Sequence, residues 1–288
     1  MPATPPLSPL KPSEESVTKR PIERFSSGAV RTEEDWLAVE SPLEIMLHYG
    51  PLSHRKRMRL AILLRTPGQD EDLAAGWLYT EGIVARREDI LQMTLTEAET
   101  WQRLEVQLHP GADFEPDRQQ RPGFIHTGCG LCGDPSLQRL LMESPFDPEK
   151  ANFVIAAQVL EQLPAQLRQF QDNFDCTGGI HAVGLFDQQG NLCLLREDVG
   201  RHNALDKVIG AAWQQGMLPL RSYIAVFSGR LGFELVQKSL QAGIPAVAAV
   251  GAPSSMAVEI AAKVGMLAVG FLREGRFNVY SGKEKLVI

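Results

Sequence analysis

Apolar runs and helical patterns alternate through the second half of the chain. The runs predict strands at 180–187, 192–198, 222–229 and 246–254, with one or two more in 266–282, and helices are predicted at 202–216, 233–243 and 256–265. In the first of these helices, Leu205, Val208 and Ile209 fall on one face at the spacing of an amphipathic helix. Such alternation predicts an α/β domain over residues 122–288, whose central sheet is largely parallel and covered by helices.

A smaller α+β region is predicted before this domain, over residues 26–121. Its strands are expected at 36–47, 57–66, 90–96 and 103–109, and a helix is expected at 69–83. The acids Asp70, Glu71 and Asp72 suit the positive N-terminal end of that helix. The polar, breaker-rich segment 109–123 then indicates a linker to the larger domain.

The start of the chain is rich in proline, serine and charged residues, and it offers little apolar surface to bury. We therefore expect a disordered tail over residues 1–25. This segment lacks the apolar run of a signal peptide. No stretch of the chain reaches the ~18 apolar residues that a membrane span requires, so no membrane association is expected.

The composition is that of a globular protein. The chain has 288 residues, of which 44% are hydrophobic and 22% are charged, and this is ample material for a core. The net charge of −6 argues against a dedicated nucleic-acid binder. Four cysteines are too few for a disulfide scaffold. In a reducing cytosol, a C-x-x-C pair among them is more typical of metal binding or reactivity.

That pair is formed by Cys129 and Cys132, within the segment HTGCGLCGDP at 126–135. The final Asp-Pro step is a typical helix start, and the residues at 136–144 predict a short helix. The pair is therefore expected in a loop just before a helix N-terminus. Three interpretations compete: a zinc site, a redox-active dithiol and a sulfur carrier.

A zinc site is disfavoured by the other ligands on offer. A closed structural site takes four ligands, commonly from two pairs, whereas the other two cysteines of this chain form no second pair. His126 would supply only a third ligand. A zinc deaminase would show H-x-E followed later by P-C-x-x-C. Here Val183 stands where the Glu is needed after His181, and the C-x-x-C precedes that histidine. We therefore predict no intrinsic metal.

A thioredoxin-type dithiol is also disfavoured. That motif begins a helix within a βαβ unit, near the start of its domain. Here glycines surround both thiols, and the helix is expected to begin only after Cys132.

A sulfur carrier fits the segment better. Such a carrier needs a thiolate that attacks a donor sulfur and then presents the sulfur to an acceptor. Gly128, Gly130 and Gly133 would let the loop enter a partner's active site. The dipole of the following helix would lower a thiol pKa, and the second thiol could release the sulfur by closing a disulfide. Cys176 and Cys193 instead fit buried, unreactive cysteines.

A second candidate site lies at the predicted strand ends, because ligands of open α/β sheets bind outside the carboxyl ends of the strands. Four such segments, at 196–203, 228–232, 251–255 and 271–276, contribute Arg196, Arg201, His202, Arg230, Arg273 and Arg276. Arginines and helix N-termini both bind phosphates, so the set predicts a site for a phosphate-bearing ligand. The chain has no Walker A sequence, so nucleotide hydrolysis by a P-loop is not indicated.

Several long motifs resemble those of the formate dehydrogenase accessory sulfurtransferase family, of FdhD type. They are TGCGLCG at 127–133, REDVGRHNALDKVIG at 196–210 and SGRLGFELVQK at 228–238. TPGQDEDLAAGWLYTEGI at 66–83 resembles the N-terminal part of that family. The resemblance covers nearly the whole chain after the expected tail. It implies a cytidine deaminase-like fold for the larger domain, and a homodimer in the cytoplasm.

The resemblance also implies a function. A cysteine desulfurase would pass sulfur to Cys129 as a persulfide, and the protein would deliver it to the molybdenum of the bis-molybdopterin guanine dinucleotide cofactor, which formate dehydrogenase needs. Cys132 matches the second cysteine of the motif. The family's cofactor-binding segment falls on Phe271, Leu272, Arg273, Glu274, Gly275 and Arg276. The alternative is a chaperone that binds this cofactor without direct sulfur relay.

Overall fold

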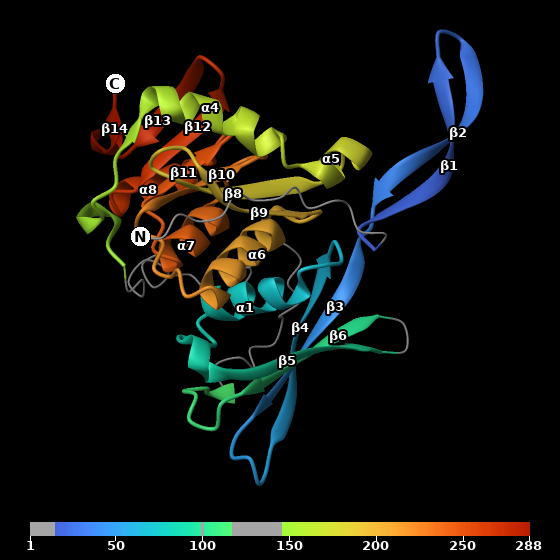
Figure 1. Cartoon of the computed structure of the whole chain (residues 1–288), viewed down its shortest axis with the longest axis vertical. Coiled ribbons are helices and arrows are strands. Elements are labelled where there is room, and N and C mark those ends of the chain that lie inside the picture. Colours follow the sequence, from blue (N-terminus) through green and yellow to red (C-terminus); the bar gives the residue numbers. More distant parts are fainter. Residues whose placement is uncertain (1–14, 99–100, 117–145) are drawn as a thin grey trace.

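The computed structural model describes residues 15–98, 101–116 and 146–288 (Figure 1). Its largest sheet has six strands in the order β13-β12-β11-β10-β8-β9. These strands are β8 (His181–Asp187), β9 (Leu192–Asp198), β10 (Tyr223–Phe227), β11 (Ala246–Ala249), β12 (Leu267–Arg273) and β13 (Arg276–Ser281). The strands predicted from apolar runs in this part of the chain are therefore confirmed, and the segment 266–282 forms two strands.

The prediction that this sheet is largely parallel is wrong. β11 pairs in parallel with β10 and with β12, whereas the pairs β8–β9, β8–β10 and β12–β13 are antiparallel. Residues 188–191 join β8 to β9, and residues 274–275 join β12 to β13. Parallel neighbours need a crossover of a dozen or more residues, so connections this short can only make hairpins.

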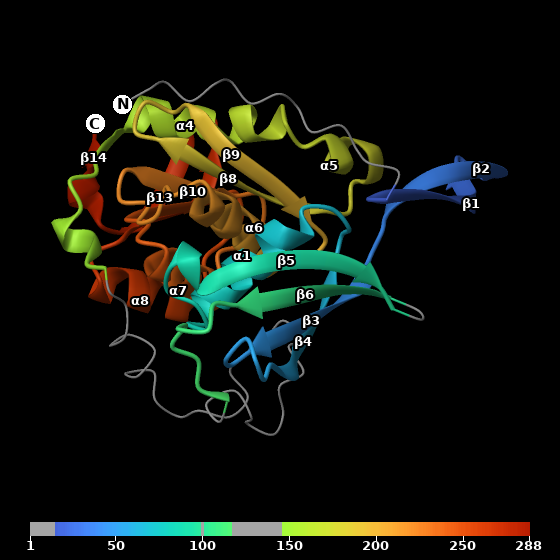
Figure 2. The same ribbon diagram turned by 60° about the horizontal axis from the view of Figure 1, so that its bottom comes forward.

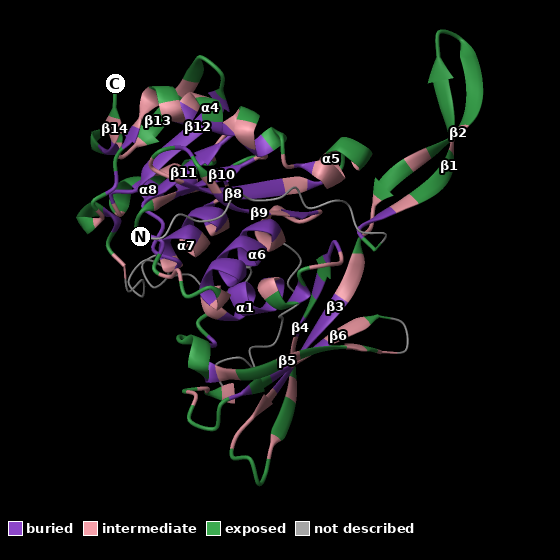
Figure 3. Ribbon diagram, viewed as in Figure 1, coloured by how far each residue is buried: buried purple, intermediate pink, exposed green. Residues whose placement is uncertain are grey.

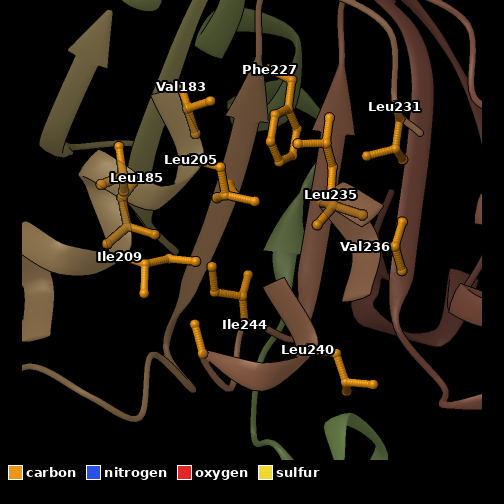
Figure 4. Close-up of a cluster of buried hydrophobic side chains, with 14 of the residues drawn as sticks. Val183, Leu185, Leu205, Ile209, Phe227, Leu231, Leu235, Val236, Leu240 and Ile244 are labelled. Carbon is orange, nitrogen blue, oxygen red and sulfur yellow. The ribbon is translucent and has the colours of Figure 1, made fainter. Parts of the chain in front are cut away.

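Helices cover both faces of the six-stranded sheet. One face carries α4 (Ala157–Arg168), which continues into the short surface helix α5 (Asp172–Thr177). The other face carries α6 (Arg201–Gln214), α7 (Phe233–Gln241) and α8 (Ser255–Lys263), with a core of hydrophobic side chains between them and the strands (Figure 4). The three helices predicted from periodicity are confirmed, whereas α4 and α5 were not predicted.

The smaller unit is a four-stranded sheet, in the order β4-β3-β6-β5, with one covering helix. Its elements are β3 (Ser41–Tyr49), β4 (Lys56–Arg65), α1 (Asp70–Thr80), β5 (Ile90–Glu97) and β6 (Gln102–Leu108). Figure 2 shows α1 between this sheet and α6 of the larger unit. The predicted helix and three of the predicted strands are confirmed. The fourth, expected at 36–47, is split, because the chain leaves one strand after Ala38 and enters β3 at Ser41.

A long hairpin projects from the body of the molecule (Figure 1). It pairs β1 (Val17–Ser26) with β2 (Ala29–Ala38) over all ten residues of each strand. The expected disordered tail over residues 1–25 is therefore wrong from residue 17 onward, because main-chain pairing orders a segment that buries little apolar surface (Figure 3). Residues 1–14 lie outside the described part of the chain, as does the helix predicted at 136–144.

The remaining elements are short. β7 (Ile155–Ala156) pairs in parallel with β14 (Leu286–Val287), and single 3₁₀ turns lie at Arg87–Asp89, Pro148–Lys150 and Lys283–Lys285. Among the described helices, none combines the length and the apolar character that crossing a membrane requires.

The two units meet where α1 crosses α6 in backbone contact. A Cβ atom added to Gly76 of α1 would lie 1.8 Å from the carbonyl oxygen of Asp206. Likewise, a Cβ atom added to Gly210 of α6 would lie 1.8 Å from the carbonyl oxygen of Asp72. Two glycines facing each other therefore set the closest approach of the two helices, and no larger residue fits at either position.

Two ion pairs lie beside this crossing, and one of them is fully buried. Lys207 and Asp198 are fully buried, with the ammonium 2.8 Å from the carboxylate. The Lys207 ammonium also donates to the carbonyl oxygen of Thr66 at 2.8 Å, and the Thr66 amide donates to Asp198 at 3.1 Å. Arg196 of β9 reaches Asp72 of α1 at 2.7 Å. The contacts of Thr66 and Asp72 join the smaller unit to α6 and β9 of the larger one, and the Lys207–Asp198 pair joins α6 to β9 within it.

We expect Gly210→Ala to destabilise the protein by about 3 kcal/mol, because backbone atoms cannot move aside for the methyl group as a side chain could. Urea unfolding would measure the change. Gly232→Ala is the matched control, since a Cβ atom there would meet nothing within 4 Å and its φ is −93°. The control should cost less than about 1 kcal/mol. Equal effects of the two substitutions would contradict the close crossing.

Candidate functional site

The two cysteines predicted to carry sulfur, Cys129 and Cys132, lie outside the described residues, together with His126. The other two cysteines differ from each other. Cys193 is buried in β9, and burial raises the pKa of its thiol to about 11, so it stays protonated and inert. Cys176 is exposed, so the expectation that it is buried is wrong. It lies on α5, a surface helix with no buried residues.

The four predicted strand-end segments come together at one edge of the six-stranded sheet. The Gly251 amide donates to the carbonyl oxygen of Gly229 at 2.8 Å, and the Phe271 amide donates to that of Gly251 at 3.0 Å. The segments 228–232, 251–255 and 271–276 therefore lie side by side. The fourth, 196–203, lies beside them because Asp198 pairs with His181 at the start of β8, the neighbour of β10.

The N-termini of three helices point to the same edge. α6, α7 and α8 begin at Arg201, Phe233 and Ser255, each a few residues after a strand has ended there. A helix N-terminus carries a partial positive charge and unpaired amides, so this edge favours anions.

A cavity of about 670 Å³ opens at this edge, between the strand ends and the helices α4 and α5. This volume falls within the range of small-molecule sites. Its apolar wall is formed by Pro164 and Leu167 of α4 and Phe174 of α5, and Ile180, just before β8, extends it. The polar groups include His181, Ser228 and Arg273, with Arg168 and Gln171 on the helical side. The cavity therefore offers both an apolar surface and positive charge.

The arginines predicted at the strand ends have different roles. Arg273 lines the cavity, where its guanidinium donates to the carbonyl oxygen of Val250 at 2.6 Å. Arg196 does not face the cavity but pairs with Asp72, so its role is structural. Arg230 and Arg276 are exposed. Arg201 lies at the start of α6, and its Nε is buried without a hydrogen-bond partner among the described residues.

The predicted cofactor segment contains a turn in an unusual conformation. Phe271 has a φ of 53°, at a bulge between β12 and β13, and the residue is 46% exposed. The side chain of Leu272 is fully buried in the core beneath α4. Glu274 and Gly275 form the hairpin turn. Of the six residues, Arg273 is the one that lines the cavity.

Two histidines lie at this edge, and both have lowered pKa values. Burial, and then the neighbouring Arg201, lower the pKa of His181, which lines the cavity. The same two causes lower the pKa of His202 to about 4, although its Nε2 is 3.0 Å from a carboxylate oxygen of Glu234. His202 is therefore neutral at physiological pH.

Sequence reasoning considered His181 only as a zinc ligand, and it missed its place in the cavity wall. A usable signal was its position at the first residue of a strand whose neighbours end at the same edge. Val183, two residues later, is 1% exposed and packs in the core (Figure 4). In the described part of the chain, no group of three or more His, Cys, Asp or Glu side chains could hold a metal ion.

Several known proteins are similar to this chain over most of its length. A protein of Streptomyces avermitilis named sulfur carrier protein FdhD is 40% identical over 277 residues, which cover 94% of this chain and 95% of that protein. Proteins of the same name from Mycobacterium tuberculosis and Sulfurisphaera tokodaii are 41% and 37% identical, over 93% and 88% of this chain and 97% and 93% of theirs.

A crystal structure of a protein from Desulfotalea psychrophila, named as a formate dehydrogenase accessory protein, has the same fold. The TM-score is 0.71 at 22% identity, and the match covers 94% of this chain and 99% of that one. The sequence profile of the FdhD/NarQ family matches residues 38–287, which include the cysteine pair and every strand of the cavity edge. The chain therefore belongs to the FdhD/NarQ family.

Proposed function

We propose that this protein is a sulfur carrier that serves the maturation of formate dehydrogenase. It takes sulfur from a cysteine desulfurase as a persulfide on Cys129 and transfers it to the molybdenum of the bis-molybdopterin guanine dinucleotide cofactor. Relatives that match nearly the whole chain are named sulfur carriers, and this supports the first part of the proposal. The observation that supports the second part is the cavity at the sheet edge, which joins an apolar wall to positive charge.

The sulfur steps balance with the two thiols of the C-x-x-C motif. The Cys129 thiolate attacks the terminal sulfur of the donor persulfide, and the donor cysteine leaves as a thiolate. Cys132 then attacks the inner sulfur of the Cys129 persulfide. Formation of the Cys129–Cys132 disulfide supplies the two electrons that reduce the outer sulfur, which leaves as hydrosulfide, the form that can replace a ligand on the metal. A dithiol reductant restores both thiols for the next cycle.

The cavity suits one guanine nucleotide part of such a cofactor. A purine ring needs an apolar or aromatic surface, and Pro164, Leu167 and Phe174 supply one. The phosphates need cations, which Arg273 provides inside the cavity. The three helix N-termini at the same edge add a favourable potential for a dianion.

The proposal also includes a cellular compartment, an oligomeric state and a fold class. Free thiols and a persulfide need a reducing compartment, and the cytoplasm provides it. There the protein would act as a homodimer. The larger unit would be cytidine deaminase-like, and its three neighbouring strands in parallel, β10, β11 and β12, support this relationship. Formate dehydrogenase is the expected recipient of the sulfurated cofactor.

The rival function is a chaperone that binds the cofactor and hands it over, while the cysteines only dock partners. The cavity fits this rival equally well, because it lies at strand ends and does not depend on thiol chemistry. Substitutions of the cysteines therefore distinguish the two functions, whereas substitutions in the cavity test the cofactor binding that both functions require.

We expect the protein, mixed with a cysteine desulfurase and cysteine, to gain the mass of one sulfur atom, and a thiol reductant should remove it. Cys129→Ala should gain none, whereas Cys132→Ala should accept sulfur but release it slowly, because no second thiol closes the disulfide. Intact-mass spectrometry measures both. Cys176→Ala is the control, since that exposed cysteine could also react. Formate dehydrogenase activated fully by the Cys129→Ala protein would support the chaperone.

We expect Arg273→Gln to weaken the binding of GDP about tenfold or more, because a charge-assisted hydrogen bond to phosphate is lost. Arg276→Gln, three residues later and exposed on β13, is the matched control and should change the affinity little. Calorimetric titration of both variants measures the difference. A larger loss with Arg276→Gln would mean that the ligand lies on the outside of the hairpin and not in the cavity.

A further inference from the structure

One ionisable side chain in the cavity wall is left without a partner. His181 is the first residue of β8, and no hydrogen bond joins its ring to another described residue. Its ring packs against Gly229, where an added Cβ atom would lie 3.1 Å from the Nδ1 and Cε1 atoms. Because Gly229 has no side chain, it leaves room for the imidazole at this edge of the sheet. A half-buried polar ring that faces a cavity, without an internal partner, is available to a ligand.

The charged groups that face His181 come from every element packed around it. Arg201 of α6 and Arg230 after β10 are cations close enough to lower the pKa of the imidazole, after burial as the largest cause. Asp198 of β9 acts in the opposite direction. Across the cavity lie Arg273 of β12 and Arg168 of α4, and Arg168 is paired with the exposed carboxylate of Asp175 on α5.

The carboxylate that acts on the pKa of His181 is already engaged. Asp198 pairs with the buried Lys207 ammonium at 2.8 Å and accepts from the amide of Gly200 at 2.9 Å. His202, next along α6, is neutral and turned toward Glu234. The cations around His181 therefore outweigh the negative charge that faces it, and this balance favours an anionic ligand.

We propose that His181 is the residue that binds a phosphate of the guanine nucleotide ligand, and that its imidazole takes up a proton as the ligand binds. This inference rests on the proposed function, because it assigns a residue to the ligand proposed there. Ser228 completes the subsite. Its hydroxyl oxygen accepts from the amide of Ala182 at 2.9 Å, which leaves its own proton free to donate into the cavity.

The physical reason is the repulsion between a protonated His181 and the neighbouring guanidinium groups, which a bound anion would remove. Without a bound anion, a proton on His181 would add one more positive charge beside Arg201 and Arg230, so the neutral ring is favoured. A bound diphosphate neutralises these charges and favours the imidazolium. Binding and protonation then assist each other, and affinity falls as the pH rises from the pKa of the free site to that of the complex.

The test uses a guanosine diphosphate sugar, GDP-mannose, as the probe. Both of its phosphates are esterified, so each carries one charge throughout the range studied, and a pH effect must come from the protein. Calorimetric titration between about pH 5 and pH 8 should show affinity falling as the pH rises. A rise of about one unit in the His181 pKa on binding corresponds to a tenfold fall.

His181→Gln cannot become charged, so it should bind GDP-mannose with an affinity that does not change with pH and that matches the native value at high pH. His48→Gln is the matched control, since His48 lies on the four-stranded sheet beside Glu105 and should leave the affinity and its pH dependence unchanged. Exposed Arg230 offers a second variant that does not threaten the core. Arg230→Gln should weaken binding and move the fall in affinity to higher pH.

The outcomes separate the two proposals. If native protein binds the probe with no pH dependence, or if His181→Gln retains the native profile, His181 is not the phosphate ligand and the proposed function stands. If native protein does not bind the probe at any pH, the guanine nucleotide ligand itself is wrong, and the inference falls with it. Should His181→Gln fail to fold, the native profile and that of Arg230→Gln decide.

Discussion

The structure depends on the contact between two glycines, Gly76 of α1 and Gly210 of α6. Helices that cross with backbones touching leave no room for side chains between them, so the two units are held at one distance and one angle. This contact fixes where α6 lies. Because α6 begins at Arg201, beside the strand ends, the crossing also sets where the positive end of the helix lies at this edge, close enough for Arg201 to lower the pKa of His181. The contact between two glycines thereby determines where the positive N-terminal end of α6 lies.

The cavity edge itself could be predicted from the sequence, and the reason is topological. Loops that follow consecutive strands of a central sheet meet at one edge, and the segments at 228–232 and 251–255 follow the parallel strands β10 and β11. Helix α4 was missed, although Leu160, Leu163 and Leu167 have helical spacing, and Pro164 lies inside the helix. The cavity's apolar wall therefore had no sequence prediction. The cysteine pair, by contrast, was predicted from the sequence alone and lies outside the described residues.

The position of an arginine near a strand end does not tell whether it binds a ligand or forms an internal ion pair. The alternation of side chains along a strand does tell which face of the sheet the arginine points to. Successive residues of a strand point to opposite faces. Arg196 pairs with Val183, whose side chain packs in the core on the α6 side of the sheet. Arg196 must therefore point to that side too, toward α1 and away from the cavity. Its pairing with Asp72 follows from the register of two strands and needs no ligand.

The same alternation explains why three charged residues stand together at the end of β9. Arg196 holds α1 through Asp72, and Asp198 holds Lys207 of α6. Glu197, between them, faces the opposite side and accepts from the amides of Asn173 and Phe174, which anchors α5; burial raises its pKa. Phe174 lines the cavity, so this carboxylate positions a wall of the site without touching a ligand. One short stretch of β9 thus joins the smaller unit, the helix that brings positive charge to the edge, and the apolar wall opposite it.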